Sequence, residues 1–228
     1  MRRLAARADG PEQMDAADLD PATYATILSD LAQVNRLTMA QRPTLRFVER
    51  AVGPATRFSL LDVGFGQGDM LRSIARWAAR RGKEAELVGI DLNPNSAPAA
   101  RAVTPREMRI AYRTGDYAAL EQPFDLVVSS LVAHHMTEGE LVAFLRWMEG
   151  RAVRGWLVND LHRHAFAHAG FPLLARVMRW HRIVREDGTL SIARSFRPAE
   201  WYALSKRAGV TAEVVRRFPF RLCVERIR

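Results

Sequence analysis

The chain is organised around one short apolar run that ends in three alternating glycines. Residues 58–63 read FSLLDV, and glycines follow at positions 64, 66 and 68. The run is too short for a helix to offset its nucleation cost, so we expect a buried strand. Residues 69–81 then carry apolar side chains at helical spacing. The stretch predicts a strand, a tight turn and a helix, in which glycines let the backbone pass close to a ligand.

The glycine spacing distinguishes between two kinds of nucleotide site. A dinucleotide site has the pattern G-x-G-x-x-G, with the pyrophosphate at the start of the helix. Here Asp69 occupies the position of the third dinucleotide glycine. A carboxylate at the start of a helix would repel a pyrophosphate. Asp62, just before the turn, favours a cationic or hydroxylated ligand instead. A purely structural turn is the alternative for this stretch taken alone.

An acid followed by Gly64, Gly66 and Gly68 resembles motif I of the class I S-adenosylmethionine-dependent methyltransferases. The resemblance implies an α/β fold with a doubly wound, seven-stranded, Rossmann-like sheet. It implies S-adenosylmethionine as the cofactor, and it places Asp62 and the three glycines in the cofactor site. A terminal antiparallel pair of strands, expected at residues 212–215 and 222–227, is typical of the same fold.

Two later strand ends extend the resemblance. A second buried strand, residues 86–91, ends in Asp91, and an acid at this place in doubly wound folds accepts hydrogen bonds from ribose hydroxyls. By resemblance, Asp91 would hold the ribose and Leu92 would lie against the adenine. After a third expected strand, Asp116 and Tyr117 match the acid and its neighbour that contact the adenine in that family. Asp116 as a turn residue or helix cap is the alternative.

A fourth expected strand, residues 124–131, leads to a pair of histidines. Its apolar residues are continuous, as in a strand covered by helices on both faces, and ligands bind beyond such strand ends. The sequence SSLVAHHM at residues 129–136 resembles small-molecule methyltransferases. The resemblance adds Ser129 to the cofactor contacts and places His134 and His135 near the methyl acceptor. The Asn/Asp-Pro-Pro-Tyr type motif of nucleic-acid amino methyltransferases is absent.

The expected chemistry needs a base beside the acceptor. Methyl transfer from a sulfonium requires donor and acceptor in line, and a hydroxyl acceptor benefits from losing its proton. In resembling O-methyltransferases the first histidine of such a pair acts with an acid that ends the fifth strand. The resemblance therefore assigns His134 as the base and Asp160 as its partner, and leaves His135 to the acceptor. Carbon or nitrogen acceptors, and two histidines that only pack, remain alternatives.

The N-terminal third predicts helices before the first strand. Residues 1–18 are expected to be mobile and dispensable. Asp20 and Pro21 begin a helix to about residue 37, and a second helix begins near Pro43. Residues 1–53 would form a helical extension that caps the sheet. Residues 54–228 would form the methyltransferase domain.

A segment after the fifth strand is too long for a structureless loop. It spans residues 161–196, and apolar residues between 171 and 181 indicate one or two helices, with a turn at Asp187-Gly188. Its position predicts a helical lid over the acceptor, with His162, Arg163 and His164 near the inner face. A surface or dimer-forming excursion is the alternative.

Composition limits the partners. The net charge is +9, but all basic residues except two lysines are arginines spread along the chain, which predicts a solvated basic surface and disfavours nucleic acid. A single cysteine, Cys223, excludes an intramolecular disulfide framework and gives no zinc pattern, as is usual in the reducing cytoplasm. We predict no metal, no membrane span and no signal peptide at residues 1–3.

These patterns converge on a small-molecule methyltransferase, most simply an O-methyltransferase. The N-terminal extension, motif I and the segment NDLHRH at residues 159–164 also resemble methyltransferases encoded beside type III polyketide synthases. That resemblance implies a phenolic or polyketide-like acceptor. An RNA-directed methyltransferase and a noncatalytic S-adenosylmethionine-binding partner subunit are the alternatives. The sequence leaves a homodimer open.

Overall fold

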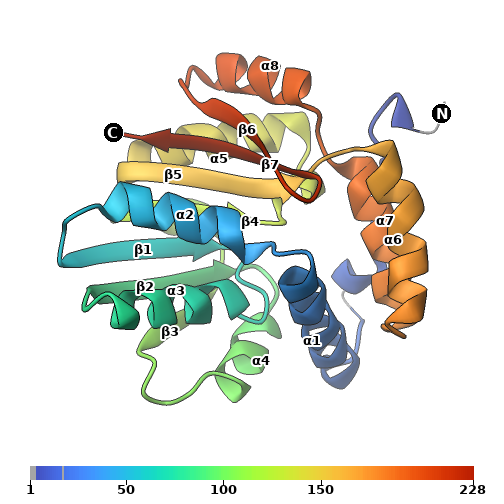
Figure 1. Cartoon of the computed structure of the whole chain (residues 1–228), viewed down its shortest axis with the longest axis horizontal. Coiled ribbons are helices and arrows are strands. Elements are labelled where there is room, and N and C mark those ends of the chain that lie inside the picture. Colours follow the sequence, from blue (N-terminus) through green and yellow to red (C-terminus); the bar gives the residue numbers. More distant parts are fainter. Residues whose placement is uncertain (1–3, 17) are drawn as a thin grey trace.

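The computed structural model describes residues 4–16 and 18–228; residues 1–3, where no signal peptide is expected, and residue 17 lie outside this description. Seven strands form one sheet in the order β3-β2-β1-β4-β5-β7-β6 (Figure 1). The first five strands pair in parallel, and β7 pairs antiparallel with β5 and β6. Their bounds are β1 Arg57–Val63, β2 Glu84–Asp91, β3 Ile110–Thr114, β4 Phe124–Ser130, β5 Ala152–Leu161, β6 Glu213–Arg217 and β7 Arg221–Ile227. The predicted doubly wound sheet and its terminal antiparallel pair are confirmed.

Helices cover both faces of this sheet. One face packs against α2, α3 and α4, and the other packs against α5 and α8. Alternate residues of each strand enter the two cores, for example Leu60 on one side and Leu61 on the other. The helices are α1 Pro21–Leu37, α2 Gln41–Val52, α3 Asp69–Arg80, α4 Ser96–Ala102, α5 Glu138–Arg151, α6 Ala165–Val177, α7 Arg182–Arg194 and α8 Pro198–Ala208, with short 3-10 turns η2 Gln13–Asp15, η3 Tyr117–Ala119 and η4 Ala133–His135.

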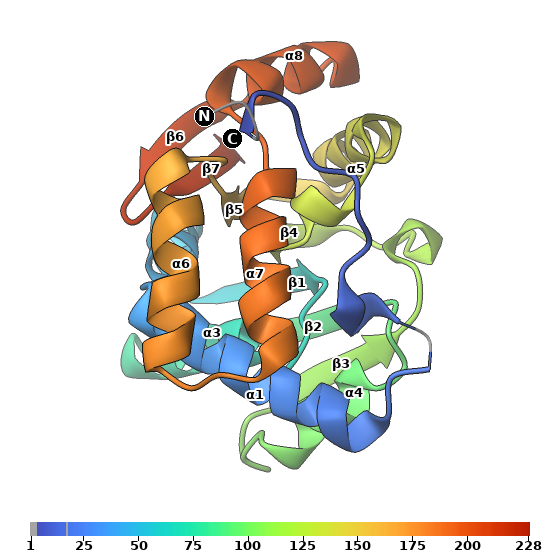
Figure 2. The same ribbon diagram turned by 90° about the vertical axis from the view of Figure 1, so that its right-hand side faces the viewer.

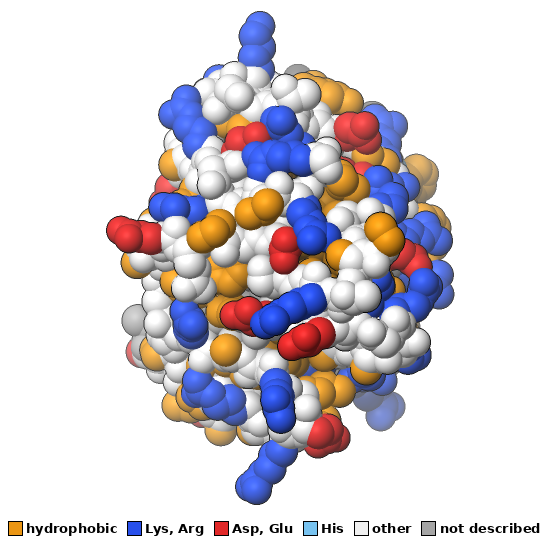
Figure 3. All heavy atoms as spheres, turned by 90° about the vertical axis from the view of Figure 1, so that its left-hand side faces the viewer, with side chains coloured by type: hydrophobic (Ala, Val, Ile, Leu, Met, Phe, Trp, Pro, Cys, Tyr) orange, Lys and Arg blue, Asp and Glu red, His pale blue; other side chains and the backbone are white. Residues whose placement is uncertain are grey.

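Local signals in the sequence explain several helix ends. The Asp20 carboxylate accepts hydrogen bonds from the backbone of Ala22 and Thr23, both at 3.0 Å, and Pro21 occupies the first turn of α1. Thr137 and Glu140 form a capping box at the start of α5. Among the described residues, no helix is long and apolar enough to cross a membrane. Basic and acidic side chains are interspersed on the face shown in Figure 3.

Residues 4–16, which precede α1, are packed against the rest of the protein, which corrects the expectation that this segment is mobile. That it is dispensable stays a prediction. Residues 4–16 run beside α7 (Figure 2). The Ala8 backbone N–H donates to Ala193 at 3.2 Å, and Arg7 donates to the Arg194 carbonyl at 2.6 Å. The Arg7 guanidinium also lies 3.7 Å from the centre of the Phe196 ring. The polar composition of this segment misled the prediction because Arg7, Glu12 and Gln13 form hydrogen bonds with residues of α7.

The long segment after β5 folds into the helices α6 and α7, which lie side by side (Figures 1 and 2). The expected turn at Asp187-Gly188 is wrong, because both residues lie inside α7. A Cβ atom on Gly188 would come within 2.3 Å of the Phe171 ring of α6. The glycine therefore permits close helix packing. A small apolar cluster, which includes Ile27 of α1 and Ile183 of α7, joins the two helices to α1.

Candidate functional site

A cavity of about 660 Å³ lies at the carboxyl ends of the parallel strands. The glycine turn, the end of β2 and the histidine pair form its sheet side. The opposite walls come from α1, α6, α7 and the segment 4–16. Ligands of open α/β sheets bind at this edge. One cavity therefore adjoins both the predicted cofactor site and the predicted acceptor site.

Two of the three glycines line the cavity, and the third serves packing. Gly64 and Gly66 line the cavity with φ of 75° and 52°. A Cβ on Gly64 would come within 2.3 Å of Val132, whereas a Cβ on Gly66 would meet only Leu28, at 3.5 Å. Gly68 caps α3 with φ of 73° and does not line the cavity; a Cβ there would come within 2.5 Å of the Tyr112 hydroxyl. The turn itself therefore requires glycine at position 68.

Carboxylates surround this turn. Asp62 is buried, and its Oδ1 has no hydrogen-bond partner among the described residues. Burial, followed by the charges of Asp69 and Asp91, raises the pKa of Asp62 well above its ordinary value. Asp91 accepts hydrogen bonds from the backbone N–H groups of Gly66 and Asn93, both at 2.9 Å, although burial still raises its pKa. Several carboxylates close together in one cavity wall favour a ligand that carries both positive charge and hydroxyl groups.

The predicted adenine contacts divide. Leu92 and Tyr117 line the cavity. The Tyr117 ring packs edge-on against Phe144 and Trp147, with centroid distances of 4.8 and 4.9 Å. Asp116 does not line the cavity: it is exposed and caps η3 by accepting a hydrogen bond from a backbone N–H. The alternative reading of Asp116 as a helix cap is the one that the geometry favours.

Ser129 is likewise turned away from the cavity, which corrects its prediction as a cofactor contact. Its buried hydroxyl donates to the Val63 carbonyl at 2.9 Å and so joins β4 to β1. The next residue, Ser130, lines the cavity instead. Side chains alternate along a strand, so an error of one residue exchanges a cavity position for a packed one.

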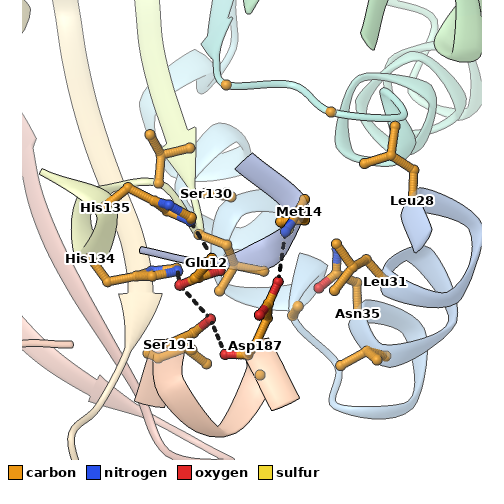
Figure 4. A pocket seen from close by; sticks show the side chains of 18 of the residues that line it. Glu12, Met14, Leu28, Leu31, Asn35, Ser130, His134, His135, Asp187 and Ser191 are labelled. Atoms are coloured by element: carbon orange, nitrogen blue, oxygen red, sulfur yellow. Dashed lines mark hydrogen bonds and ion pairs between the residues drawn. The ribbon is translucent and has the colours of Figure 1, made fainter. Parts of the chain in front are cut away.

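The first histidine and the acid that ends β5 form a buried pair. His134 Nδ1 lies 2.7 Å from Asp160 Oδ1, and the His134 backbone N–H donates to Asp160 Oδ2 at 2.7 Å. Burial alone would raise the pKa of Asp160, but the His134 charge and hydrogen bonds from His134 and Leu161 hold that pKa below its ordinary value. With Nδ1 so engaged, Nε2 is the ring nitrogen left for a ligand, and His134 lines the cavity (Figure 4).

Two acids of the N-terminal segment reach the same histidines. Glu12 Oε1 lies 3.7 Å from His134 Nε2, and Glu12 Oε2 lies 3.7 Å from His135 Nε2 (Figure 4). His135 Nδ1 lies 3.0 Å from Asp15 Oδ2. Glu12 accepts a hydrogen bond from Ser191 of α7 at 2.9 Å, and burial raises its pKa to about 7. Sequence reasoning missed both acids because no spacing links residues so distant along the chain.

This cluster has the composition of a metal site but an adverse neighbour. Glu12, His134 and His135 each bring one ligand atom within 4.8 Å of the others. Arg194 Nη1, however, lies 3.7 Å from Glu12 Oε1. A guanidinium so close to the shared carboxylate would repel a divalent cation. The absence of a metal stays a prediction.

The predicted acceptor contacts after β5 do not line the cavity. Arg163 is buried and donates to the Ser195 carbonyl and to Glu200. His164 caps α6 and stacks on Phe220, with a centroid distance of 4.8 Å. The His162 backbone N–H donates to the Phe220 carbonyl, and burial together with nearby cations lowers the pKa of its ring to about 4. The side chains of Arg163 and His164 thus hold the connection between β5 and α6 against Ser195, Glu200 and Phe220.

Comparison with known proteins agrees with this architecture. A family model described as a methyltransferase domain matches residues 60–152. No curated protein sequence matches the chain. Human N-acetylserotonin methyltransferase, solved in complex with S-adenosylmethionine, is similar with a TM-score of 0.64 and 15% identity over 92% of this chain and 56% of that chain. This chain thus spans little more than half of the human protein's length.

Two further solved structures are similar over nearly their whole length. The plantazolicin methyltransferase BpumL, in complex with a monoazolic desmethylPZN analog and SAH, has a TM-score of 0.65 and 14% identity over 91% of this chain and 94% of that chain. Magnesium protoporphyrin IX methyltransferase from Synechocystis PCC 6803 has a TM-score of 0.56 and 15% identity over 100% of this chain and 92% of that chain. The chain has the fold of the class I S-adenosylmethionine-dependent methyltransferases, and residues 60–152 match the model of a methyltransferase domain.

Proposed function

We propose that the chain transfers the methyl group of S-adenosylmethionine to a hydroxyl group of a small apolar molecule, phenolic or polyketide-like. The observation that carries the proposal is the His134–Asp160 pair, in which His134 lines the cavity and its Nδ1 lies 2.7 Å from Oδ1 of the buried Asp160. A histidine held in this way is suited to accept a proton from a hydroxyl group.

The cofactor would lie across the glycine turn. Asp91, at the end of β2, would accept hydrogen bonds from the ribose hydroxyls. Leu92 and Tyr117 would flank the adenine, because both line the cavity beyond Asp91. The backbone at Gly64 and Gly66 would adjoin the methionine portion, whose ammonium group and sulfonium suit the neighbouring acids. In this arrangement Gly68 supports the turn without touching the ligand.

The reaction would then proceed in one displacement. The acceptor hydroxyl gives its proton to His134 Nε2 as its oxygen attacks the methyl carbon. The carbon–sulfur bond breaks, and its electron pair stays on sulfur, which yields S-adenosylhomocysteine and the methyl ether. Asp160 stabilises the imidazolium that forms, and the proton passes to solvent after the product leaves. Holding donor and acceptor in line supplies the rest of the rate enhancement.

The cavity walls support a small apolar acceptor. The helices α1, α6 and α7 line it with aliphatic and aromatic side chains, namely Ile27, Leu31, Phe171, Leu174, Ile183 and Val184. We propose that α6 and α7 act as a lid over this acceptor. A noncatalytic binding module would have no use for the buried histidine–carboxylate pair. An RNA substrate would need an open approach, whereas three helices and the segment 4–16 bound this cavity.

A panel of acceptors tests the proposal. The purified chain is incubated with S-adenosylmethionine and with simple phenols, resorcinols and alkylated pyrones, and mass spectrometry detects the added methyl group. Nuclear magnetic resonance then shows whether a methoxy group has formed. Asp160→Asn is the matched control, and it should lose product with every acceptor that the wild type methylates. Methylation of amines or carbons alone would contradict the assignment of oxygen as the acceptor atom.

A further inference from the structure

A second charged group in the cavity wall has no role in the mechanism so far. Arg221 begins β7, is only 2% exposed, and lines the cavity. Its Nη2 donates to the Thr38 hydroxyl at 3.1 Å. Its Nε and Nη1 have no hydrogen-bond partner among the described residues. Burial lowers the pKa of Arg221 to about 10, against the opposing charge of Asp160, so the side chain is still a cation at neutral pH.

Buried arginines elsewhere in this fold are differently placed. Arg163 forms an ion pair with Glu200, and Arg72 donates to the Gln67 carbonyl and to the Thr104 hydroxyl. Arg221 forms no ion pair within 4.0 Å with any carboxylate of the described residues. A buried guanidinium without a counter-ion is costly, because its donors lose water and gain nothing in return. A ligand that accepts hydrogen bonds from these donors would offset that cost.

The position of Arg221 relates it to the reacting groups. It pairs with Leu161 across the sheet, beside Asp160 of the catalytic pair. The preceding turn contributes Pro219 and Phe220 to the cavity wall. On the other side, Thr38 belongs to the connection between α1 and α2. A negatively charged group bound to Arg221 would thus lie between the proposed base and this connection, inside the cavity.

We propose that Arg221 is an anion subsite that binds a carboxylate of a ligand held in this cavity. The inference rests on the proposed function, which places two ligands in the cavity. The carboxylate has two sources, the methionine portion of the cofactor and the methyl acceptor. Guanidinium–carboxylate hydrogen bonds are charge-assisted, and Nη1 and Nε offer three N–H donors for them.

Calorimetry on the full chain separates the two sources. The variants are Arg221→Met, which removes the charge, and Arg221→Lys, which keeps it. Arg216→Met, on the exposed side of β6, is the matched control. S-adenosylhomocysteine is compared with 5′-methylthioadenosine, which lacks the amino-acid carboxylate. On the protein saturated with S-adenosylhomocysteine, 2-naphthoate is compared with 2-naphthol.

Loss of charge-assisted hydrogen bonds predicts weaker binding in Arg221→Met by about 10- to 100-fold. If the cofactor supplies the carboxylate, the loss falls on S-adenosylhomocysteine and spares 5′-methylthioadenosine. If the acceptor supplies it, the loss falls on 2-naphthoate and spares 2-naphthol. Either result supports the anion subsite, and Arg221→Lys should recover part of the affinity.

Stability gives a second readout. Removal of an uncompensated buried charge should raise the melting temperature of the ligand-free Arg221→Met protein, while the rise caused by the carboxylate ligand shrinks. If Arg221→Met does not fold, the same measurements are made on Arg221→Gln. Wild-type affinity for both carboxylate ligands in a folded variant would overturn the subsite. Failure of the wild type to bind S-adenosylhomocysteine would instead overturn the proposed function.

Discussion

Asp160 engages one nitrogen of His134 and leaves the other for a ligand, so the two residues should act as one unit. We predict that His134→Ala lowers kcat by roughly 10²- to 10⁴-fold, the usual range for a lost general base, with little change in cofactor affinity. Asp160→Asn should act in the same direction, because an amide can hold the imidazole in the wrong tautomer. Steady-state kinetics with an acceptor from the panel, together with calorimetry, measure both effects.

Two controls sharpen this prediction. The double variant should be no slower than the slower single variant, since residues that work as a unit are not additive. His135→Ala should retain more activity, because that ring contacts Asp15 and Glu12 but not Asp160. Near-normal turnover in His134→Ala would remove the base from the mechanism and leave positioning alone.

Glu12 links the N-terminal segment to this pair in a pH-dependent way. Its pKa rises from 4.5 to about 7 on folding, so the folded protein keeps a proton that the unfolded chain releases. Its contribution to the free energy of unfolding is therefore fully present below about pH 4.5 and is lost as the pH rises to about 7.

We predict that Glu12→Gln flattens this part of the pH dependence, because the amide cannot titrate. Denaturant unfolding at several pH values, with Glu213→Gln on the exposed side of β6 as the control, measures the difference from wild type. The comparison with wild type is needed because His134 and His135 also face Glu12. Identical slopes in wild type and Glu12→Gln would show that folding does not raise the pKa of Glu12.

Two acids that follow neighbouring strands should differ in their effect on the cofactor. Asp91 lines the cavity and holds the Gly66 N–H, whereas Asp116 is exposed and only caps η3. We predict that Asp91→Ala raises the Kd for S-adenosylhomocysteine about tenfold, while Asp116→Ala leaves it nearly unchanged. Calorimetry measures the affinity of both variants, and NAD serves as a control ligand that should not bind. An equal loss of affinity in the two variants would show that Asp116 also belongs to the cofactor site.

At this scale the sequence predicted residues that follow a strand directly and missed those brought in from elsewhere. Gly64, Asp91, His134 and Asp160 lie where strand ends placed them, because carboxyl ends of parallel strands meet at one edge. The prediction for Ser129 was wrong by one position, because the serine that lines the cavity is Ser130. Residues drawn to the cavity by tertiary packing, such as Glu12 and Arg221, have no local pattern, so only the fold could reveal them.

At the scale of elements, the pair α6–α7 depends on a close approach. Gly188 of α7 faces the Phe171 ring, and an added Cβ would come within 2.3 Å of it. We predict that Gly188→Val separates the two helices and lowers methyl transfer at least tenfold, while binding of S-adenosylhomocysteine changes little, because the cofactor contacts lie on the sheet side. Kinetics and calorimetry on the same preparation measure the two effects.

A second glycine of the same helical pair provides the control. A Cβ on Gly170 of α6 would meet nothing within 4 Å, so Gly170→Ala should retain activity and gain up to about 1 kcal/mol in the free energy of unfolding from helix propensity. Full activity in Gly188→Val would show that the packing of α6 on α7 does not shape the acceptor site. The presence of helices here was predictable from periodicity and length. Their turn was not, because a glycine inside a helix and a glycine in a turn look alike in sequence.

At the scale of the whole molecule, one cavity unites parts that the sequence separates. The doubly wound sheet supplies its floor, and α1, α6, α7 and the segment 4–16 supply its walls. The doubly wound, seven-stranded sheet followed from the resemblance to the class I methyltransferases, whereas the packing of residues 4–16 against α7 followed from no pattern in the chain. Among the described residues that line the cavity, Arg221 is the one arginine or lysine.

A crystal structure of the complex with S-adenosylhomocysteine tests the central claim most directly, because it places the cofactor relative to the proposed base. We predict that the ribose hydroxyls bond Asp91, that the adenine lies beside Tyr117, and that the sulfur faces the part of the cavity bounded by His134. A nucleoside bound away from Asp91, or a sulfur separated from His134 by protein, would contradict the assignment of this cavity as the site of methyl transfer.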